Sequence, residues 1–341
     1  MNKGDIIIRN AIVHIMDSTV GMPVLSDVEL SYGSDFADFL KEHIYKVFAS
    51  DEKKKCRFVE EESDIFRLIE DTNNGSMDFV TFSKQVAEKL YGIMNSNIDI
   101  PSADLIIVCF EVNQIMHLAL LKMNYKQSYM HNTIAMEEGN TNSIVMYKSI
   151  LPNESQKLSE AAIINLTDYS ILLLEKKYDI NGTKTNYFSK MFLNCSSQLS
   201  QKSKLSIVEK AIESVQKDYY NDSEQFEEKM KVKSIIHEEM TNEGVISIPE
   251  VVEKVFEDKE ELKEKFKEKI EKYNIKEEEE IKPQNEATTR KFSKQHLTTD
   301  TGIEIKIPME QYNSTDNIEF ITNEDGTISV LIKNIGHITS K

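Results

Sequence analysis

The stretch LIIVCFEVNQIMHLALLKM, residues 105–123, decides how the first half of this chain folds. Two apolar runs, at 105–112 and 115–123, are separated by Asn113 and Gln114. Asparagine is a favoured turn residue, because its side chain bonds to nearby backbone and it tolerates left-handed dihedral angles. Two such runs joined by a short polar pair predict a β-hairpin. Each run is far shorter than the roughly 18 consecutive apolar residues that indicate a membrane-spanning helix.

The segments around this hairpin mix strand and helix patterns without a regular order. Strands are predicted at 6–16, 161–166 and 170–178, with a short one at 23–25, and helices at 34–47 and 79–94. Ser34 is the predicted N-cap of the first helix. A parallel sheet would show strands and helices in strict alternation, so this mixture favours an α+β fold. We therefore predict a mixed sheet domain with helices over residues 1–202.

Residues 203–280 carry helical spacing and an excess of acidic side chains. Four helices are predicted from caps and apolar spacing: 205–219, 223–241 ending before Gly244, one starting with the capping box Ser247-Ile248-Pro249-Glu250, and one capped by Asp258 with Glu261. This segment is expected to be an acidic helical unit with a charge-rich exterior.

The last segment, residues 281–341, returns to β patterns. Isoleucines alternate with charged residues over 303–307, and residues 317–334 predict a hairpin that turns at Asp325-Gly326. Before it, the stretch EEEEIKPQNEATTRKFSKQH, residues 277–296, changes from acidic to basic. We interpret its acidic half as a linker, helped by Pro283, and its basic half as part of the C-terminal β segment. The sequence leaves open how this segment packs against the other parts.

Composition sets the class of protein. The chain has 341 residues, of which 40% are hydrophobic and 29% charged, and its formal net charge is −17. These values are typical of a globular protein of about two domains. Three widely spaced cysteines fit neither a disulfide framework nor a zinc site, and the N-terminus lacks the uninterrupted apolar core of a signal peptide. We expect a soluble protein of the reducing cytoplasm.

Catalytic motifs were sought without success. The sequence has no glycine-rich phosphate loop, nucleophile elbow or zinc-protease helix. His14, His117 and His337 lie in strand patterns and are expected to be partly buried core histidines, and Cys195 a buried structural thiol. We therefore expect no enzyme activity, no catalytic residue, no metal and no cofactor.

Positive charge is concentrated in two short stretches of an otherwise acidic chain. Residues 221–280 hold 11 basic and 20 acidic side chains, whereas residues 151–220 hold 9 and 8. A few phosphate contacts from such stretches are enough for weak, salt-sensitive DNA binding. The candidate nucleic-acid-binding residues are Lys184, Lys190, Lys202, Lys204, Arg290, Lys291 and Lys294. The alternative interpretation is that these lysines and this arginine are ordinary solvated side chains.

Several segments resemble one family in order along the chain. They are IIIRNAIVHIMD and PVLSDVEL near the start, NYFSKMFLNCSSQLSQKSKLSIVEKAI in the middle, and KFSKQHLTTDTGIEIKIP and ITNEDGTISVLIKNIG near the end. Together they resemble the bacterial nucleoid-associated protein family of the NdpA (YejK) type. The resemblance implies a non-enzymatic cytoplasmic protein that is found with the nucleoid. It supplies no family site residues that can be carried over to this chain.

Two functions follow as hypotheses. The first is weak, sequence-nonspecific DNA binding through the seven basic residues, because backbone contacts position a protein without reading bases. The second is an adaptor or DNA mimic that binds a topoisomerase or another basic DNA-handling protein through its acidic surface. Symmetric dimers are common, and a homodimer is one arrangement that the sequence allows.

Overall fold

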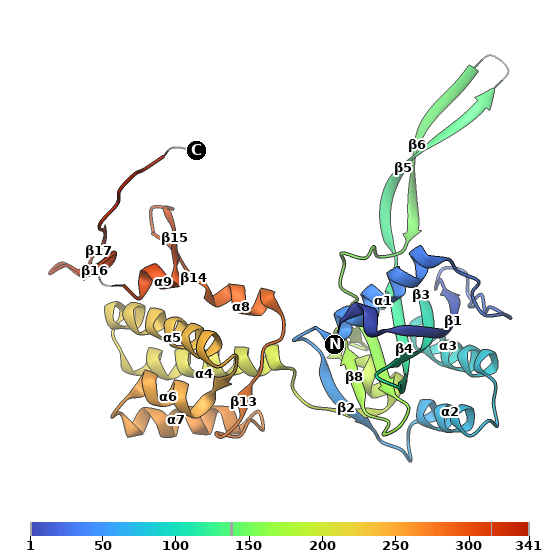
Figure 1. The fold of residues 1–341 in the computed structure, drawn as a ribbon, viewed down its shortest axis with the longest axis horizontal. Helices are drawn as coiled ribbons and strands as arrows, with labels where there is room; N and C mark the ends of the chain where they lie inside the picture. The colour runs from blue at the N-terminus through green and yellow to red at the C-terminus, as the bar shows by residue number, and fades with distance from the viewer. Residues whose placement is uncertain (1, 137–138, 315, 340–341) are drawn as a thin grey trace. The chain divides into compact units, whose positions relative to one another are not determined.

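The computed structural model describes residues 2–136, 139–314 and 316–339 (Figure 1). The chain divides into two compact units, Met1–Leu199 and Ser200–Lys341. The first unit is built on a seven-stranded sheet, and the second combines helices with short hairpins. The fold is therefore α+β, as predicted. No helix among the described residues is both long enough and apolar enough to cross a membrane.

The sheet of the first unit is antiparallel throughout, with the strand order β1-β3-β4-β7-β8-β2-β11. Its strands are β1 (Ile7–Met16), β2 (Lys54–Phe58), β3 (Ala103–Val112), β4 (Ile115–Asn124), β7 (Glu160–Asn165), β8 (Ile171–Leu174) and β11 (Cys195–Ser197). The segment at 23–25 contributes only an isolated bridge between Ile15 and Val24.

The predicted hairpin is confirmed and lies inside this sheet. β3 and β4 pair from Val112 opposite Ile115 to Ala103 opposite Asn124. Asn113 and Gln114 form the turn with positive φ angles of 51° and 65°, which match the right-handed twist of the strands they join. The apolar runs are continuous because both faces of the sheet are covered, so most side chains of these strands are buried in one of two cores.

Helices cover the two faces of the sheet and create two separate cores. On one face, α1 (Ser34–Phe48) packs Leu40, Ile44 and Val47 against alternate residues of the strands. The other face is covered by α2 (Asp64–Asn73), α3 (Phe79–Asn95) and the short helix η2 (Phe188–Leu193). The predicted cap of α1 is wrong by one residue, since Gly33 is the N-cap and Ser34 is the first helical residue.

A second long hairpin projects from this unit into solvent (Figure 1). Its strands are β5 (Lys126–Met136) and β6 (Gly139–Ile150), which pair only with each other among the described residues. No helix or strand was predicted for these residues. The unit is completed by η1 (Lys3–Asp5) and by the small hairpin of β9 (Tyr178–Ile180) and β10 (Thr183–Thr185), which turns at Asn181-Gly182.

The second unit contains the four predicted helices. They are α4 (Gln201–Tyr219), α5 (Asp222–Asn242), α6 (Ile248–Phe256) and α7 (Glu260–Glu271). Ser247 caps α6 as predicted, because its side chain accepts a hydrogen bond from the Glu250 backbone N–H. The predicted cap of α7 is wrong: Lys259 is the N-cap residue, and no side chain closes that end of the helix.

The C-terminal segment lies in the same unit as these helices. Its elements are β13 (Glu280–Ile281), which pairs with β12 (Ile246–Ser247), then α8 (Glu286–Phe292), β14 (Lys294–Thr298), β15 (Glu304–Pro308), α9 (Met309–Tyr312), β16 (Ile318–Thr322) and β17 (Ile328–Ile332). The predicted hairpin at 317–334 is confirmed as β16 and β17. Ile281 is fully buried, so the stretch that we interpreted as a linker is anchored within its unit.

Candidate nucleic-acid interface

The predicted basic residues fall in both units. In the first, Lys184 lies in β10 and Lys190 in η2. Both side chains are exposed, and neither has an ion pair among the described residues. The tight turn at Asn181-Gly182 places Lys184 on a short surface hairpin, where its side chain is exposed to solvent. These two lysines are therefore available to an anionic partner.

In the second unit, most of the predicted cations are already paired with carboxylates. Lys204 pairs with Glu279, and Arg290 with Glu286 at 2.7 Å. Lys291 Nζ donates to both oxygens of Glu209, at 2.7 and 2.9 Å. Pairing lowers the local positive charge that a phosphate would meet. Lys202 is exposed in the first turn of α4. Lys294 is exposed and has no ion pair among the described residues.

Lys291 also borders an open cavity of about 440 Å³ between α4, α5 and β14. Further positive side chains around it are Lys210, Lys229 and Lys233. Partial burial lowers the pKa of Lys233, and the nearby positive charge of Lys291 lowers it further. Glu209 opposes that shift, and Glu209 and Glu213 also line the cavity, so carboxylates offset part of the positive charge around it.

The structure reveals two basic residues that the sequence analysis missed, Lys55 and Arg57 on β2. Side chains alternate along a strand, so Cys56 and Phe58 enter the core while Lys55 and Arg57 share the opposite face. Both are exposed. Lys55 lies opposite Leu172 of β8, and Arg57 lies opposite Ser196 of β11.

These two cations border an open depression of about 460 Å³ on the sheet, lined by residues of β8, β2 and β11 and their flanking loops. Its other polar lining residues are Ser170, Ser196 and Gln198. Arg57 Nη1 donates to the Asp168 carbonyl oxygen at 3.3 Å, and the Asp168 carboxylate accepts from Ser170 Oγ at 2.7 Å. The arrangement combines two cations with hydroxyl and amide groups, which is typical of contacts to a nucleic-acid backbone.

The sequence did contain a signal for this surface. The run KKKCRF at 53–58 holds three lysines and an arginine within its first five residues. Alternation of charged and apolar residues at its end indicates a strand with one exposed face. A count over residues 1–150 hides this strand, because that region holds 14 basic and 22 acidic side chains.

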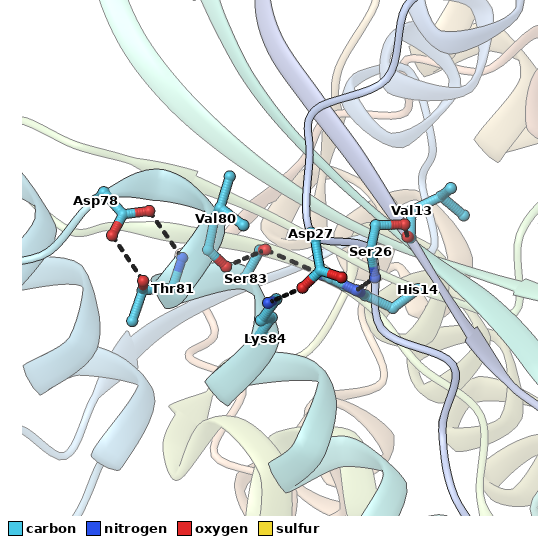
Figure 2. A network of polar contacts seen from close by, with 9 residues as sticks. All are labelled: Val13, His14, Ser26, Asp27, Asp78, Val80, Thr81, Ser83 and Lys84. Atoms are coloured by element: carbon cyan, nitrogen blue, oxygen red, sulfur yellow. Dashed lines mark hydrogen bonds and ion pairs between the residues drawn. The ribbon is translucent and has the colours of Figure 1, made fainter.

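His14 is a buried titratable group of the first unit, and its ring takes part in a network of hydrogen bonds (Figure 2). Its Nδ1 accepts from the Ser26 backbone N–H at 3.1 Å, so Nε2 carries the proton and donates to Ser83 Oγ at 3.0 Å. The Ser83 hydroxyl in turn donates to the Val80 carbonyl oxygen at 2.7 Å. Burial lowers the pKa of His14 to about 4, with a smaller effect of Lys84. The neutral ring joins β1 to α3 and is a structural group.

The other predicted core residues are partly confirmed. His117 is half-buried in β4, whereas the prediction is wrong for His337, which is exposed outside any strand. Cys195 is buried as expected. Its neighbour Cys56 has a raised pKa, caused first by a hydrogen bond to Cys195 and then by burial. No group of three or more possible metal ligands occurs within residues 2–136, 139–314 and 316–339.

The fold and this surface define an acidic α+β protein with local basic patches on exposed strands and helices. Comparison with protein families then identifies it further. The chain matches the family model described as nucleoid-associated protein YejK over residues 12–338, and it belongs to that family. The resemblance found in the sequence segments is thereby confirmed. Among curated proteins, no sequence gives a significant match.

Proposed function

We propose that this protein is a non-enzymatic, cytoplasmic component of the nucleoid that binds DNA weakly and without sequence specificity. The observation that carries the proposal is the pair Lys55 and Arg57 beside Ser170, Ser196 and Gln198 on one exposed sheet face. Family membership supports the association with the nucleoid. Contacts of this kind recognise phosphates and sugars, which every sequence presents.

The acidic remainder of the chain accounts for the low affinity. A net charge of −17 repels DNA at long range, so contact depends on a few local cations. Besides Lys55 and Arg57, these are Lys184, Lys190 and Lys294, each exposed without an ion pair among the described residues. Nonspecific binding of this type has a Kd on the order of 10⁻⁴ to 10⁻⁶ M at physiological salt.

Fluorescence anisotropy with a labelled duplex over a salt series tests the proposal. The wild-type protein should bind AT-rich and GC-rich duplexes equally and lose affinity steeply as salt rises. The variant Lys55→Gln with Arg57→Gln should lower the slope of log K against log salt by about 2, because each phosphate contact contributes about 1. A second variant combines Lys184→Gln, Lys190→Gln and Lys294→Gln and should lower it by about 3.

The control removes the same charge elsewhere. Lys265→Gln with Lys306→Gln changes two lysines that already pair with Glu261 and Glu304, and it should leave the slope unchanged. An unchanged slope in both test variants would show that these residues do not contact DNA. Equal loss in the control would show that only net charge matters.

The adaptor hypothesis is the second candidate, and the acidic excess of residues 221–280 favours it. Much of that charge is paired inside the unit, since Lys263 binds Glu253 and Glu260, and Lys231 binds Glu257. The surface is therefore mixed rather than uniformly acidic, which makes DNA binding the preferred proposal. Affinity capture from nuclease-treated lysate separates the two, since a topoisomerase or another basic protein retained without DNA would support the adaptor.

A further inference from the structure

The hairpin of β5 and β6, here called the arm, exposes an unusual amount of apolar surface. Seven large apolar side chains of the arm are exposed by 39% to 70%. By register, Met130 lies opposite Val145, and Tyr129 lies opposite Met146. Directly opposite residues share a face of a sheet. One face of the arm therefore carries Met130, Ile134, Val145 and Tyr147, and the other carries Tyr129, Ile144 and Met146.

An arm of two strands has no interior in which these side chains could be buried. Isolated two-stranded hairpins are marginally stable in water, and need a further strand or a packed face for stability. The outer edges of β5 and β6 also pair with no other strand in the described part of the chain. Unpaired edges and an exposed apolar patch together indicate a surface that another molecule covers.

Charge decides which kind of molecule fits. None of the described residues of β5 and β6 is Asp or Glu, and the only lysines are Lys126 and Lys148. Eleven residues of β5 extend about 36 Å at roughly 3.3 Å per residue, a length over which duplex DNA carries about 20 phosphate charges. Two lysines cannot match that charge. In the sequence, Glu137 and Glu138 stand between the residues of β5 and those of β6, and their negative charge further disfavours DNA.

A nearly neutral apolar surface suits a partner with the same surface. We infer that the arm is the site through which a second copy of this chain binds, arm against arm. A symmetric dimer places the same patch on both subunits, so the two apolar faces and two free edges of one arm meet their equivalents. The arms also solve an electrostatic problem, because two bodies that each carry a charge of −17 repel each other. A carboxylate-poor ribbon offers the copies a contact surface that itself carries little of that charge.

Mass measurement of the full chain tests the inference. Light scattering during size-exclusion chromatography should give a mass for the wild type that rises with loading, from one chain at 1 µM to two chains at 100 µM. The variant Met130→Glu with Ile144→Glu puts one carboxylate on each face of the arm and should weaken association at least tenfold. Circular dichroism should be unchanged, because both side chains lie outside the cores.

The matched control places the same charges on exposed apolar residues elsewhere. Val28 and Ile98 are exposed by 73% and 99%, and Val28→Glu with Ile98→Glu should keep the two-chain mass. A one-chain mass for the wild type at 100 µM, or a two-chain mass for the arm variant, would overturn the inference. Anisotropy with duplex DNA is measured on the same variants. Loss of DNA binding by the arm variant with no change in mass would identify DNA as the occupant and also overturn it.

Discussion

Two hairpins follow each other along this chain and have opposite environments. β3 and β4 lie inside a sheet that helices cover on both faces, and Leu120 is fully buried there. β5 and β6 continue directly from β4 but project as a separate ribbon, where Ile144 is 70% exposed. Both carry apolar residues on both faces. The comparison shows that the same local pattern stabilises the fold in one place and leaves apolar side chains exposed in the other.

The largest expected effect comes from a charged pair beside the buried hairpin. Lys122 of β4 and Glu160 of β7 are opposite each other and fully buried, 3.9 Å apart. Burial lowers the pKa of Lys122 to about 8, and Glu160 opposes that shift. Glu160→Gln leaves the ammonium group without its counter-charge and should cost about 3–5 kcal/mol of unfolding free energy. Denaturant unfolding followed by circular dichroism measures it.

A double variant is the control for this pair. Lys122→Met with Glu160→Leu removes both charges and should restore most of the stability, because a buried pair replaced by apolar residues is often neutral. If Glu160→Gln unfolds at the wild-type denaturant concentration, the pair is not buried as described.

The second prediction compares the hairpins directly. Leu120→Ala removes a side chain between packed neighbours and should cost about 2–5 kcal/mol. Ile144→Ala in the arm should cost less than about 0.5 kcal/mol when unfolding is measured at protein concentrations low enough for single chains. Equal costs at both sites would mean that the arm is packed within one chain, which would remove the contrast.

The third prediction concerns His14 on β1, the strand that pairs with β3. Its pKa falls from 6.5 to about 4 on folding, so between these values the unfolded chain binds a proton that the folded chain does not. The stabilising contribution is complete above pH 6.5 and is lost as the pH falls. The loss from pH 7 to pH 5 should be about 2 kcal/mol. In the variant His14→Gln, the free energy of unfolding should fall less between pH 7 and pH 5 than in the wild type. Denaturant unfolding at a series of pH values measures this difference.

Two comparisons sharpen that experiment. The pKa of His43 is also lowered to about 4 by burial. Part of the loss of stability at acidic pH should therefore remain in His14→Gln. His337→Gln changes an exposed histidine and should leave the pH profile as it is in the wild type. An unaltered profile in His14→Gln would contradict the neutral, buried ring.

The smallest expected effect lies in the turn of the buried hairpin. Asn113 has a φ of 51°, a conformation that asparagine tolerates better than other residues with a Cβ. Asn113→Ala should cost about 1 kcal/mol, whereas Asn113→Gly should be nearly neutral. Thermal unfolding of the two variants, compared with the wild type, resolves the difference. A stable Asn113→Ala variant would show that the turn does not restrain β3 and β4.

The sequence predicted the elements that local chemistry determines. The hairpin at 105–123 and the Ser247 cap depend on neighbouring residues, and both are confirmed. The cap at Asp258 was wrong because the helix begins after Lys259, one residue later than the capping pattern predicted. The arm escaped prediction because many polar residues separate its apolar ones, so that no strand pattern stood out.

The candidate interface was harder to predict than the fold. Charge counts along the sequence found Arg290 and Lys291 but could not show that Glu286 and Glu209 pair with them. They also missed Lys55 and Arg57, whose common face depends on the strand β2 and its neighbours. Ion pairs between residues distant in the sequence decide which cations are available to a phosphate. Such pairs cannot be predicted from composition.

The central claim is that the arm, unlike the buried hairpin, is covered only when two copies meet. Amide hydrogen exchange of the wild-type protein at 1 and 100 µM tests it most directly. Amides of β3 and β4 should be protected equally at both concentrations, whereas those of β5 and β6 should become protected only at the higher one. Exchange in β5 and β6 that is equally fast at both concentrations would contradict the claim.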